Sequence, residues 1–209
     1  MPDADAVPPP RAVAYTAAMT PADPDVRLML RYRDGDATAF DALYSRHKDG
    51  LYRYLLGLCL DAATAEDLFQ EAWSKLIAAR HRYRPTAKFS TYLYRVAHNC
   101  FVDHYRRRRS RGREEDADAV TLPAREGDPG RETERALARD RLQRLLAELP
   151  TEQRDAFLLR EEGGLTVAEI AAATGVGTET AKSRLRYAYR KLREGFAALS
   201  GAGGGRGDG

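Results

Sequence analysis

Cysteine is scarce in this 209-residue chain, and long apolar runs are lacking. The two cysteines, Cys59 and Cys100, are too few for a disulfide scaffold or a four-thiolate zinc site. The best apolar run, residues 55–60, falls far short of the roughly 20 residues that a membrane helix needs. The first residues contain neither a basic leader nor an apolar stretch, which argues against a secretory signal. We therefore expect a cytoplasmic protein.

The small net charge of +3 hides an uneven distribution, because the 34 Lys and Arg and the 31 Asp and Glu residues occur in blocks. With 43% apolar and 9% aromatic residues, the chain has enough apolar surface to form a core, which excludes wholesale disorder. Strand-like alternation does not persist, whereas helical spacing of apolar residues recurs. The sequence predicts an all-α fold of two small helical domains joined by a flexible acidic linker, the second domain a helix-turn-helix.

Proline, glycine and charge mark the predicted boundaries. Residues 1–24 hold six of the ten prolines and residues 200–209 hold six of the seventeen glycines, so both ends are predicted to be disordered. Residues 25–112 and 136–199 are predicted to be the two helical domains. Residues 113–135 have no period and many carboxylates, and we interpret them as the acidic linker.

The second predicted domain contains a helix-turn-helix pattern. Thr166 and Glu169 form a predicted capping box before a short alanine-rich helix, a glycine turn follows, and Thr178 begins a basic helix. Its polar side chains face away from an inward stripe that includes Ala181 and Tyr189, as a DNA-reading helix requires, although a merely solvated face is the alternative. Lys182, Ser183 and Arg186 are expected to read base edges. The residues predicted to contact duplex DNA are Thr178, Thr180, Lys182, Ser183, Arg184, Arg186 and Arg190.

The first predicted domain presents a polar, acidic helix face. A helix is predicted from a cap at Thr64 to about Ala79, with Phe69 and Trp73 partly exposed at the edge of its buried stripe. A polar face edged by large aromatics suits docking on a basic protein surface, although a solvated face is the alternative. Its residues are Asp67, Gln70, Glu71 and Ser74.

Cations and aromatic side chains alternate in the segment that follows. This mixture is typical of proteins that bind unpaired DNA, because cations follow the backbone while rings stack on bases. A helix is predicted from a cap at Ser90 to about Arg109, where Asn99 can both donate and accept a hydrogen bond to a base edge. The residues predicted to bind the separated strand are Tyr83, Arg84, Lys88, Phe89, Tyr92, Arg95, Asn99 and Arg106.

In this order, the motifs resemble an extracytoplasmic-function (ECF) bacterial sigma factor of the sigma-70 family. The resemblance covers residues 25–199 and rests on Asp67-Leu-Phe-Gln70-Glu71-Ala, on Phe89-Ser-Thr-Tyr-Leu-Tyr94-Arg-Val-Ala-His-Asn99 with the basic tract after it, and on Leu149-Pro150 through the helix-turn-helix. Two departures, Pro85-Thr86 in the loop and Arg186-Tyr187 in the last helix, prevent transfer of the family's base preferences.

The resemblance implies a promoter-specificity subunit of RNA polymerase. Asp67, Gln70 and Glu71 would then dock on the clamp of the polymerase core. The 83–88 loop would capture a base flipped from the minus-ten element, with Asn99 on the next helix. The helix-turn-helix would read the minus-thirty-five element, and its domain would touch the polymerase flap. The resemblance also implies an anti-sigma factor as a partner.

The sequence also leaves other classes of function open. A stand-alone helix-turn-helix regulator that binds closed duplex is the main alternative. A metalloenzyme would rest on Cys100 and His104, four residues apart on an apolar helix face, where buried thiols and core histidines are commoner. The chain has no glycine-rich phosphate loop, so we expect no ATP hydrolysis. We likewise expect no enzyme activity, cofactor or small-molecule substrate. The acidic linker has three interpretations: it threads a basic polymerase channel, folds back on residues 106–113, or is merely solvated.

Overall fold

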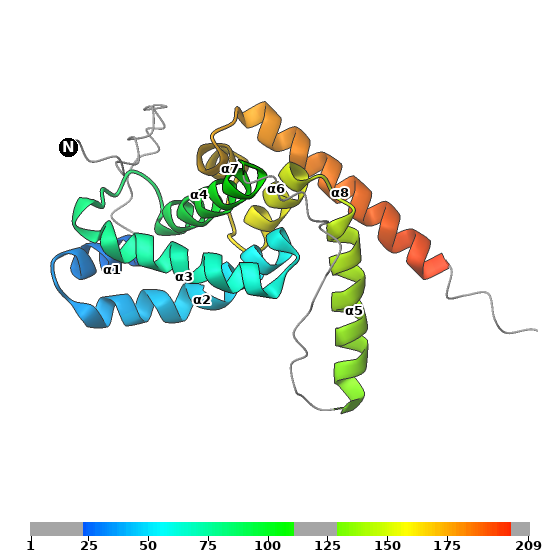
Figure 1. Ribbon diagram of the computed structural model, residues 1–209, viewed down its shortest axis with the longest axis horizontal. Helices are drawn as coiled ribbons and strands as arrows, with labels where there is room; N and C mark the ends of the chain where they lie inside the picture. The colour runs from blue at the N-terminus through cyan, green and yellow to red at the C-terminus, as the bar shows by residue number, and fades with distance from the viewer. Residues whose placement is uncertain (1–22, 111–128, 202–209) are drawn as a thin grey trace, which may run out of the picture.

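The computed structural model of the chain describes residues 23–110 and 129–201, which form eight α-helices and one 3-10 turn with no strand among them (Figure 1). This confirms the prediction of an all-α fold. The elements are α1 (Pro24–Arg33), α2 (Ala37–Cys59), α3 (Ala62–Ala78), η1 (Arg80–Arg82), α4 (Phe89–Ser110), α5 (Pro129–Ala147), α6 (Thr151–Glu161), α7 (Val167–Thr174) and α8 (Thr178–Gly201). We call α1–α4 the first unit and α5–α8 the second unit.

The helix starts follow local capping chemistry, though not always at the predicted residue. The capping box of Thr166 and Glu169 at α7 is confirmed. The predicted cap at Thr64 is wrong, because the Asp61 carboxylate accepts the Thr64 N–H at 2.8 Å and α3 therefore begins earlier. Helix α6 begins at Thr151, and Pro150 precedes it without a side-chain cap.

Asp23 caps two helices at once. Its carboxylate accepts the backbone N–H of Asp25 at 2.9 Å, at the start of α1, and that of Phe89 at 3.2 Å, at the start of α4. The predicted cap of α4 at Ser90 is therefore replaced by a residue 66 positions earlier in the chain. Asp23 and Pro24 also do not belong to a disordered extension as predicted, because they are held by α1 and α4; residues 1–22 lie outside the described residues.

The predicted linker is shorter than expected at its C-terminal end. Helix α5 begins at Pro129, and a proline is well suited to a first helical position because its fixed φ matches the helix and its missing N–H is not needed there. Residues 129–135 are thus helical rather than linker. The remaining predicted linker, up to residue 128, and the predicted tail after Gly201 lie outside the described residues.

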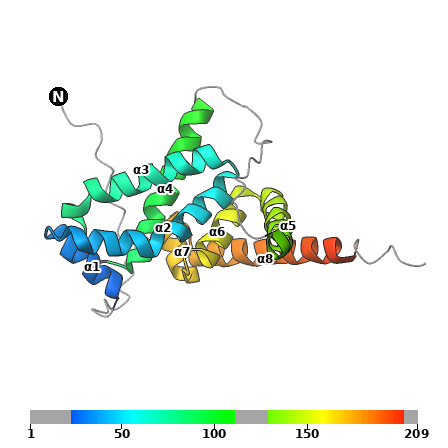
Figure 2. The same cartoon turned by 90° about the horizontal axis from the view of Figure 1, so that it is seen from below.

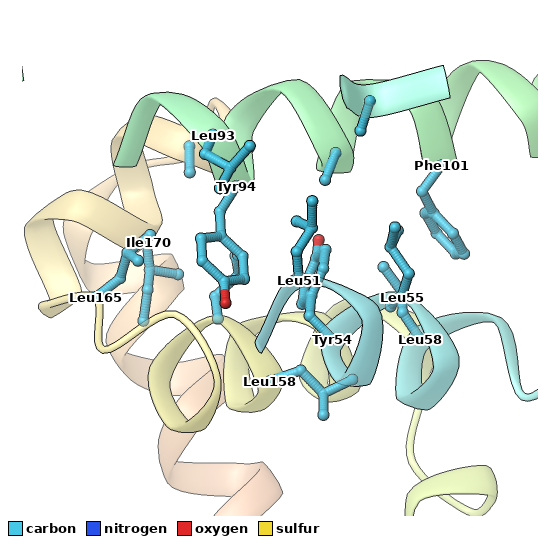
Figure 3. Packing of buried hydrophobic residues seen from close by; sticks show 14 of the residues in the cluster. Leu51, Tyr54, Leu55, Leu58, Leu93, Tyr94, Phe101, Leu158, Leu165 and Ile170 are labelled. Carbon is cyan, nitrogen blue, oxygen red and sulfur yellow. The ribbon is translucent and has the colours of Figure 1, made fainter. Parts of the chain in front are cut away.

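The two units share one hydrophobic core. The buried cluster runs from Met29 in α1 to Leu192 in α8, and helices α2 and α4 of the first unit pack against α6 and α7 of the second. Figure 2 shows α6 and α7 beside α2, and Figure 3 shows Leu158, Leu165 and Ile170 facing side chains of α2 and α4. The sequence analysis treated the units separately and did not predict this contact.

Candidate nucleic-acid interface

The acidic face of α3, defined by Asp67, Gln70, Glu71 and Ser74, is open to solvent except at one residue. Asp67, Gln70 and Ser74 are exposed. Glu71 is half-buried, and its carboxylate forms ion pairs with Lys75 at 2.9 Å and with Arg107 of α4 at 3.6 Å. The structure therefore joins the acidic face to the basic end of α4, a link that the sequence analysis did not find.

The two aromatic residues beside this face differ in burial. Phe69 is half-buried, as predicted. Trp73 was expected to be partly exposed, but only 5% of it is accessible. Its ring packs edge-on against Phe40 at a centroid distance of 5.7 Å and lies 5.1 Å from the ring of Tyr44, because α2 covers that side of α3. Trp73 is therefore a core residue.

Tyr83 and Phe89, which were predicted to stack on unpaired bases, are buried instead. They are 3% and 0% exposed, Tyr83 packs edge-on against Tyr92 at 5.1 Å, and Phe89 packs against His47 at 5.1 Å. Burial of the Tyr83 hydroxyl raises its pKa above the ordinary range. Both rings belong to the hydrophobic core, where full burial of an aromatic side chain is worth roughly 1.5–3 kcal/mol of transfer free energy.

The other predicted strand-binding residues lie on or near the surface. Arg84, Asn99 and Arg106 are exposed, and Tyr92 and Arg95 are half-buried. The Arg95 guanidinium lies over the Tyr92 ring at 6.0 Å, a weak cation–π contact. These five residues are called the strand face below.

Lys88, the remaining predicted strand-binding residue, contacts the second unit. Its ammonium lies 3.1 Å from Oε1 of Glu169, the capping residue of α7. Lys88, which was predicted to bind the minus-ten element, is thus paired with a residue of the helix-turn-helix unit.

The helix-turn-helix of α7 and α8 has the predicted geometry. Gly175 ends α7 in the left-handed conformation at φ +70°, which favours glycine, and Ala181, Leu185, Ala188 and Leu192 of α8 face the core. On the opposite side, the predicted DNA contacts are exposed or half-buried. The exposed ones are Thr178, Thr180, Lys182, Arg186 and Arg190, and the half-buried ones are Ser183 and Arg184. These seven residues are called the reading face below.

Two exposed tyrosines of α8 have different neighbours. Tyr189 was placed among the inward residues, but it is 37% exposed; its ring packs edge-on against Phe157, and its hydroxyl donates to Glu161. Tyr187 is exposed on the outer side, with the guanidinium groups of Arg186 and Arg190 at 5.3 and 4.8 Å from its ring. These contacts restrain the two arginines before any DNA is bound.

Cys100 and His104 do not form part of a metal-ligand cluster. Burial is the main cause that raises the pKa of the Cys100 thiol to about 11, although the neighbouring Lys75 opposes it. In the described part of the chain, no three His, Cys, Asp or Glu side chains gather where they could hold a metal ion. Within residues 23–110 and 129–201, no helix combines the length and apolar character needed to cross a bilayer.

Comparisons with known proteins identify both units. The sigma-70 region 2 family matches residues 43–111, and the sigma-70 region 4 family matches residues 139–192. The ECF RNA polymerase sigma factor SigL of Mycobacterium tuberculosis is 35% identical over 162 residues, 76% of this chain and 89% of SigL. The chain belongs to the ECF sigma factors. The sigma factor CarQ of Myxococcus xanthus is 31% identical over 170 residues, 79% of this chain and 94% of CarQ.

Solved structures share the fold of this sigma factor. CnrH, in its complex with the cytosolic domain of CnrY, superposes with a TM-score of 0.62 at 22% identity, covering 83% of this chain and 97% of CnrH. RpoE of Bartonella quintana, in complex with the anti-sigma factor NepR, gives a TM-score of 0.61 at 22% identity over 76% of this chain and 96% of RpoE. Membership of the family confirms the promoter-specificity function that the motifs implied, over the alternative of a stand-alone regulator.

Proposed function

We propose that this sigma factor divides promoter recognition among three surfaces. The acidic face of α3 docks on the clamp of the polymerase core, the strand face of α4 holds the opened minus-ten element, and the reading face of α8 binds the minus-thirty-five element as duplex. One observation supports this division: the polar side of each helix is largely open, while its apolar side lies in the core. The helix-turn-helix unit also contacts the flap.

Strand opening in this proposal is driven by binding energy rather than by catalysis in this chain. Extruding a base from the duplex costs a few kcal/mol. A base stacked on an aromatic side chain recovers roughly 1–3 kcal/mol, and the Tyr92 ring is the accessible aromatic of the strand face. Asn99, exposed about two turns further along α4, is placed to hydrogen-bond a base edge, while Arg106 contacts phosphate.

An anti-sigma factor is the expected regulatory partner. Two solved proteins with this fold were determined in complexes: CnrH with the cytosolic domain of CnrY, and the sigma factor RpoE with the anti-sigma factor NepR. Since the polymerase core and promoter DNA lie in the bacterial cytoplasm, we expect the chain to act there.

The proposal is tested by replacing Asn99 with Ala in holoenzyme reconstituted with core polymerase. Promoter opening, measured as permanganate-reactive thymines near the start site, should fall by about fivefold or more, since a base contact is worth about 1–3 kcal/mol. Binding to core should be unchanged. Ser45→Ala, at an exposed site on α2, is the matched control. Equal loss of opening and of core binding would contradict the role assigned to Asn99.

The acidic face is tested separately with Asp67→Lys. Reversal of this exposed charge should weaken the binding of the free chain to core polymerase by at least tenfold, and opening should fall in proportion. Unchanged core affinity would remove α3 from the docking surface.

A further inference from the structure

We propose that Tyr187, which was not among the residues predicted to contact DNA, determines part of the sequence specificity of the minus-thirty-five contact. Its ring contacts the C5 methyl group of a thymine in the major groove and holds the guanidinium groups of Arg186 and Arg190 in place for the duplex. The inference rests on the proposed function, because it requires α8 to bind the minus-thirty-five element as duplex DNA.

Tyr187 lies on the outer side of α8. It is 38% exposed, whereas the residues that face the core on the other side are buried: Ala181, Leu185, Ala188 and Leu192. Ser183 and Tyr187 are four residues apart, and Tyr187 and Arg190 are three apart, so the three side chains form one row along the helix. Figure 1 shows α8, in orange to red, along the outer edge of the molecule. The ring therefore lies between two residues of the reading face, on a helix that the major groove can admit.

The ring contacts two cations of the reading face. The guanidinium of Arg186 lies 5.3 Å and that of Arg190 lies 4.8 Å from the ring centroid, within the roughly 6 Å over which an aromatic ring attracts a cation. Arg190 also lies 4.0 Å from Glu194, but the two side chains are 63% and 66% exposed, and such ion pairs contribute little. The Tyr187 ring is therefore the main restraint on Arg190.

This restraint favours DNA binding because it acts before the duplex arrives. A free arginine side chain loses rotamer freedom when it contacts DNA, and that loss weakens binding. An arginine already held by a ring loses less. Each exposed cation–π contact corresponds to about a two- to fivefold change in an equilibrium constant, so loss of the ring should weaken duplex binding by about this factor for each arginine that contacts the DNA.

Tyr189, the other exposed tyrosine of α8, has a different environment. Its hydroxyl donates to Glu161 and its ring packs edge-on against Phe157 at 5.4 Å, so it holds α8 against α6. The Tyr187 ring instead contacts side chains of its own helix and does so on the cationic side. Of the two tyrosines, Tyr187 is therefore the one placed to meet the duplex.

The chemistry of an aromatic ring selects the base that it contacts. The donors and acceptors along base edges are matched by polar side chains, whereas the apolar group that a base pair presents in the major groove is the C5 methyl of thymine. Removal of one such group from water against the Tyr187 ring is worth about fourfold in affinity. A thymine at the position opposite Tyr187 should therefore be preferred to the other three bases.

Replacement of single thymines by deoxyuridine tests this contact. Uracil pairs with adenine as thymine does and lacks only the C5 methyl. Holoenzyme is titrated with promoter duplexes that carry one such replacement in either strand of the minus-thirty-five element. The wild type should bind one of them about fourfold more weakly than the unmodified duplex. If no replacement weakens wild-type binding, the thymine contact is overturned.

Tyr187→Ala should bind the unmodified duplex about tenfold more weakly than the wild type and should no longer distinguish thymine from uracil. Alanine favours a helix, so α8 should stay folded, which far-ultraviolet circular dichroism checks. Tyr187→Phe retains the ring and should retain the preference for thymine. Tyr189→Phe is the matched control and should behave as the wild type. A preference for thymine that persists in Tyr187→Ala would assign the methyl contact to another residue and overturn the proposal.

A double-mutant cycle tests how the ring positions arginine. Tyr187→Leu keeps an apolar group for the methyl contact but offers no aromatic face to a cation. Arg190→Ala should therefore weaken duplex binding less in the Tyr187→Leu chain than in the wild type, by about two- to fivefold. Lys191→Ala, at the exposed cation beside it, should cost the same in both chains. Equal costs of Arg190→Ala in both chains would overturn the positioning role.

A scrambled minus-thirty-five element separates the two levels of inference. If scrambling leaves wild-type holoenzyme binding unchanged, the proposed function of the reading face fails. If scrambling abolishes specific binding but no single thymine methyl affects it, the role of Tyr187 fails and the proposed function stands.

Discussion

The capping box at the start of α7 allows a quantitative prediction for Glu169→Ala. The Glu169 carboxylate accepts the backbone N–H and the hydroxyl of Thr166, both at 2.8 Å, and only 8% of the residue is exposed. A side-chain cap is worth about 1 kcal/mol, and hydrogen bonds to a charged group are stronger than neutral ones. We expect Glu169→Ala to lower the free energy of unfolding by about 2 kcal/mol.

The ion pair with Lys88 contributes much less. The Lys88 side chain is 58% exposed, and exposed pairs are worth about 0–1 kcal/mol. Lys88→Met should therefore cost less than half as much stability as Glu169→Ala. Comparing the stability losses of the two variants separates the cap from the contact between the units. The cap joins Glu169 to its neighbour Thr166, whereas the ion pair joins Glu169 to Lys88 of the first unit.

The contacts of Glu169 also determine in which direction the stability of the fold changes with pH. Burial alone would raise the pKa of Glu169, but the hydrogen bonds from Thr166 and the Lys88 ammonium outweigh it, so the pKa in the folded chain is below its ordinary value. The stabilisation is complete above the unfolded pKa of about 4.3 and is lost as the pH falls through the folded pKa. Glu169→Gln keeps an oxygen acceptor for the Thr166 N–H but cannot be protonated in this range. Its free energy of unfolding should therefore lack the loss at acid pH that Glu169 causes.

Urea unfolding followed by circular dichroism, at neutral pH and at several values below pH 5, measures both effects. Amide hydrogen exchange in α7 gives a local reading that does not depend on two-state unfolding of the whole chain. If Glu169→Ala proves no more destabilising than Lys88→Met, or if Glu169→Gln loses stability with acid as steeply as the wild type, the reasoning about the cap is refuted.

Three further predictions address single features. The Tyr83 hydroxyl is buried without a hydrogen-bond partner among the described residues, so Tyr83→Phe should raise the free energy of unfolding by about 1 kcal/mol in thermal melts; a loss of stability would reveal a partner. Replacing Lys182 and Arg186 with Ala should reduce the salt dependence of minus-thirty-five binding by about 0.9 in log–log slope for each phosphate contact removed, and an unchanged slope would assign both side chains to bases alone. Cys59 and Cys100 should resist alkylation at pH 7 and react on denaturation, because burial raises their pKa values to about 12 and about 11; fast labelling of the native chain would contradict their burial.

Local patterns predicted much of the fold and part of the site. Apolar spacing identified the long helices, and the Thr166 capping box fixed the start of α7 because its hydrogen bonds join residues only three apart. Asn99 and Arg106 are exposed on the side of α4 away from the core, as predicted from their spacing. The rings of Tyr83 and Phe89 were predicted to be accessible but are buried. They flank the loop between η1 and α4, where no helical spacing indicates which side chains face the core.

The sequence by itself determined which stretches are helical, which of their faces are apolar, and that the motifs belong together as a sigma factor. Only the tertiary structure decided what covers those faces. Asp23 caps α4 from 66 positions away, and Tyr54 donates to a carboxylate 101 positions later. Neither contact leaves a periodic trace, because helical spacing reports relations within one or two turns, whereas the partner of a buried polar group is set by how separate helices pack.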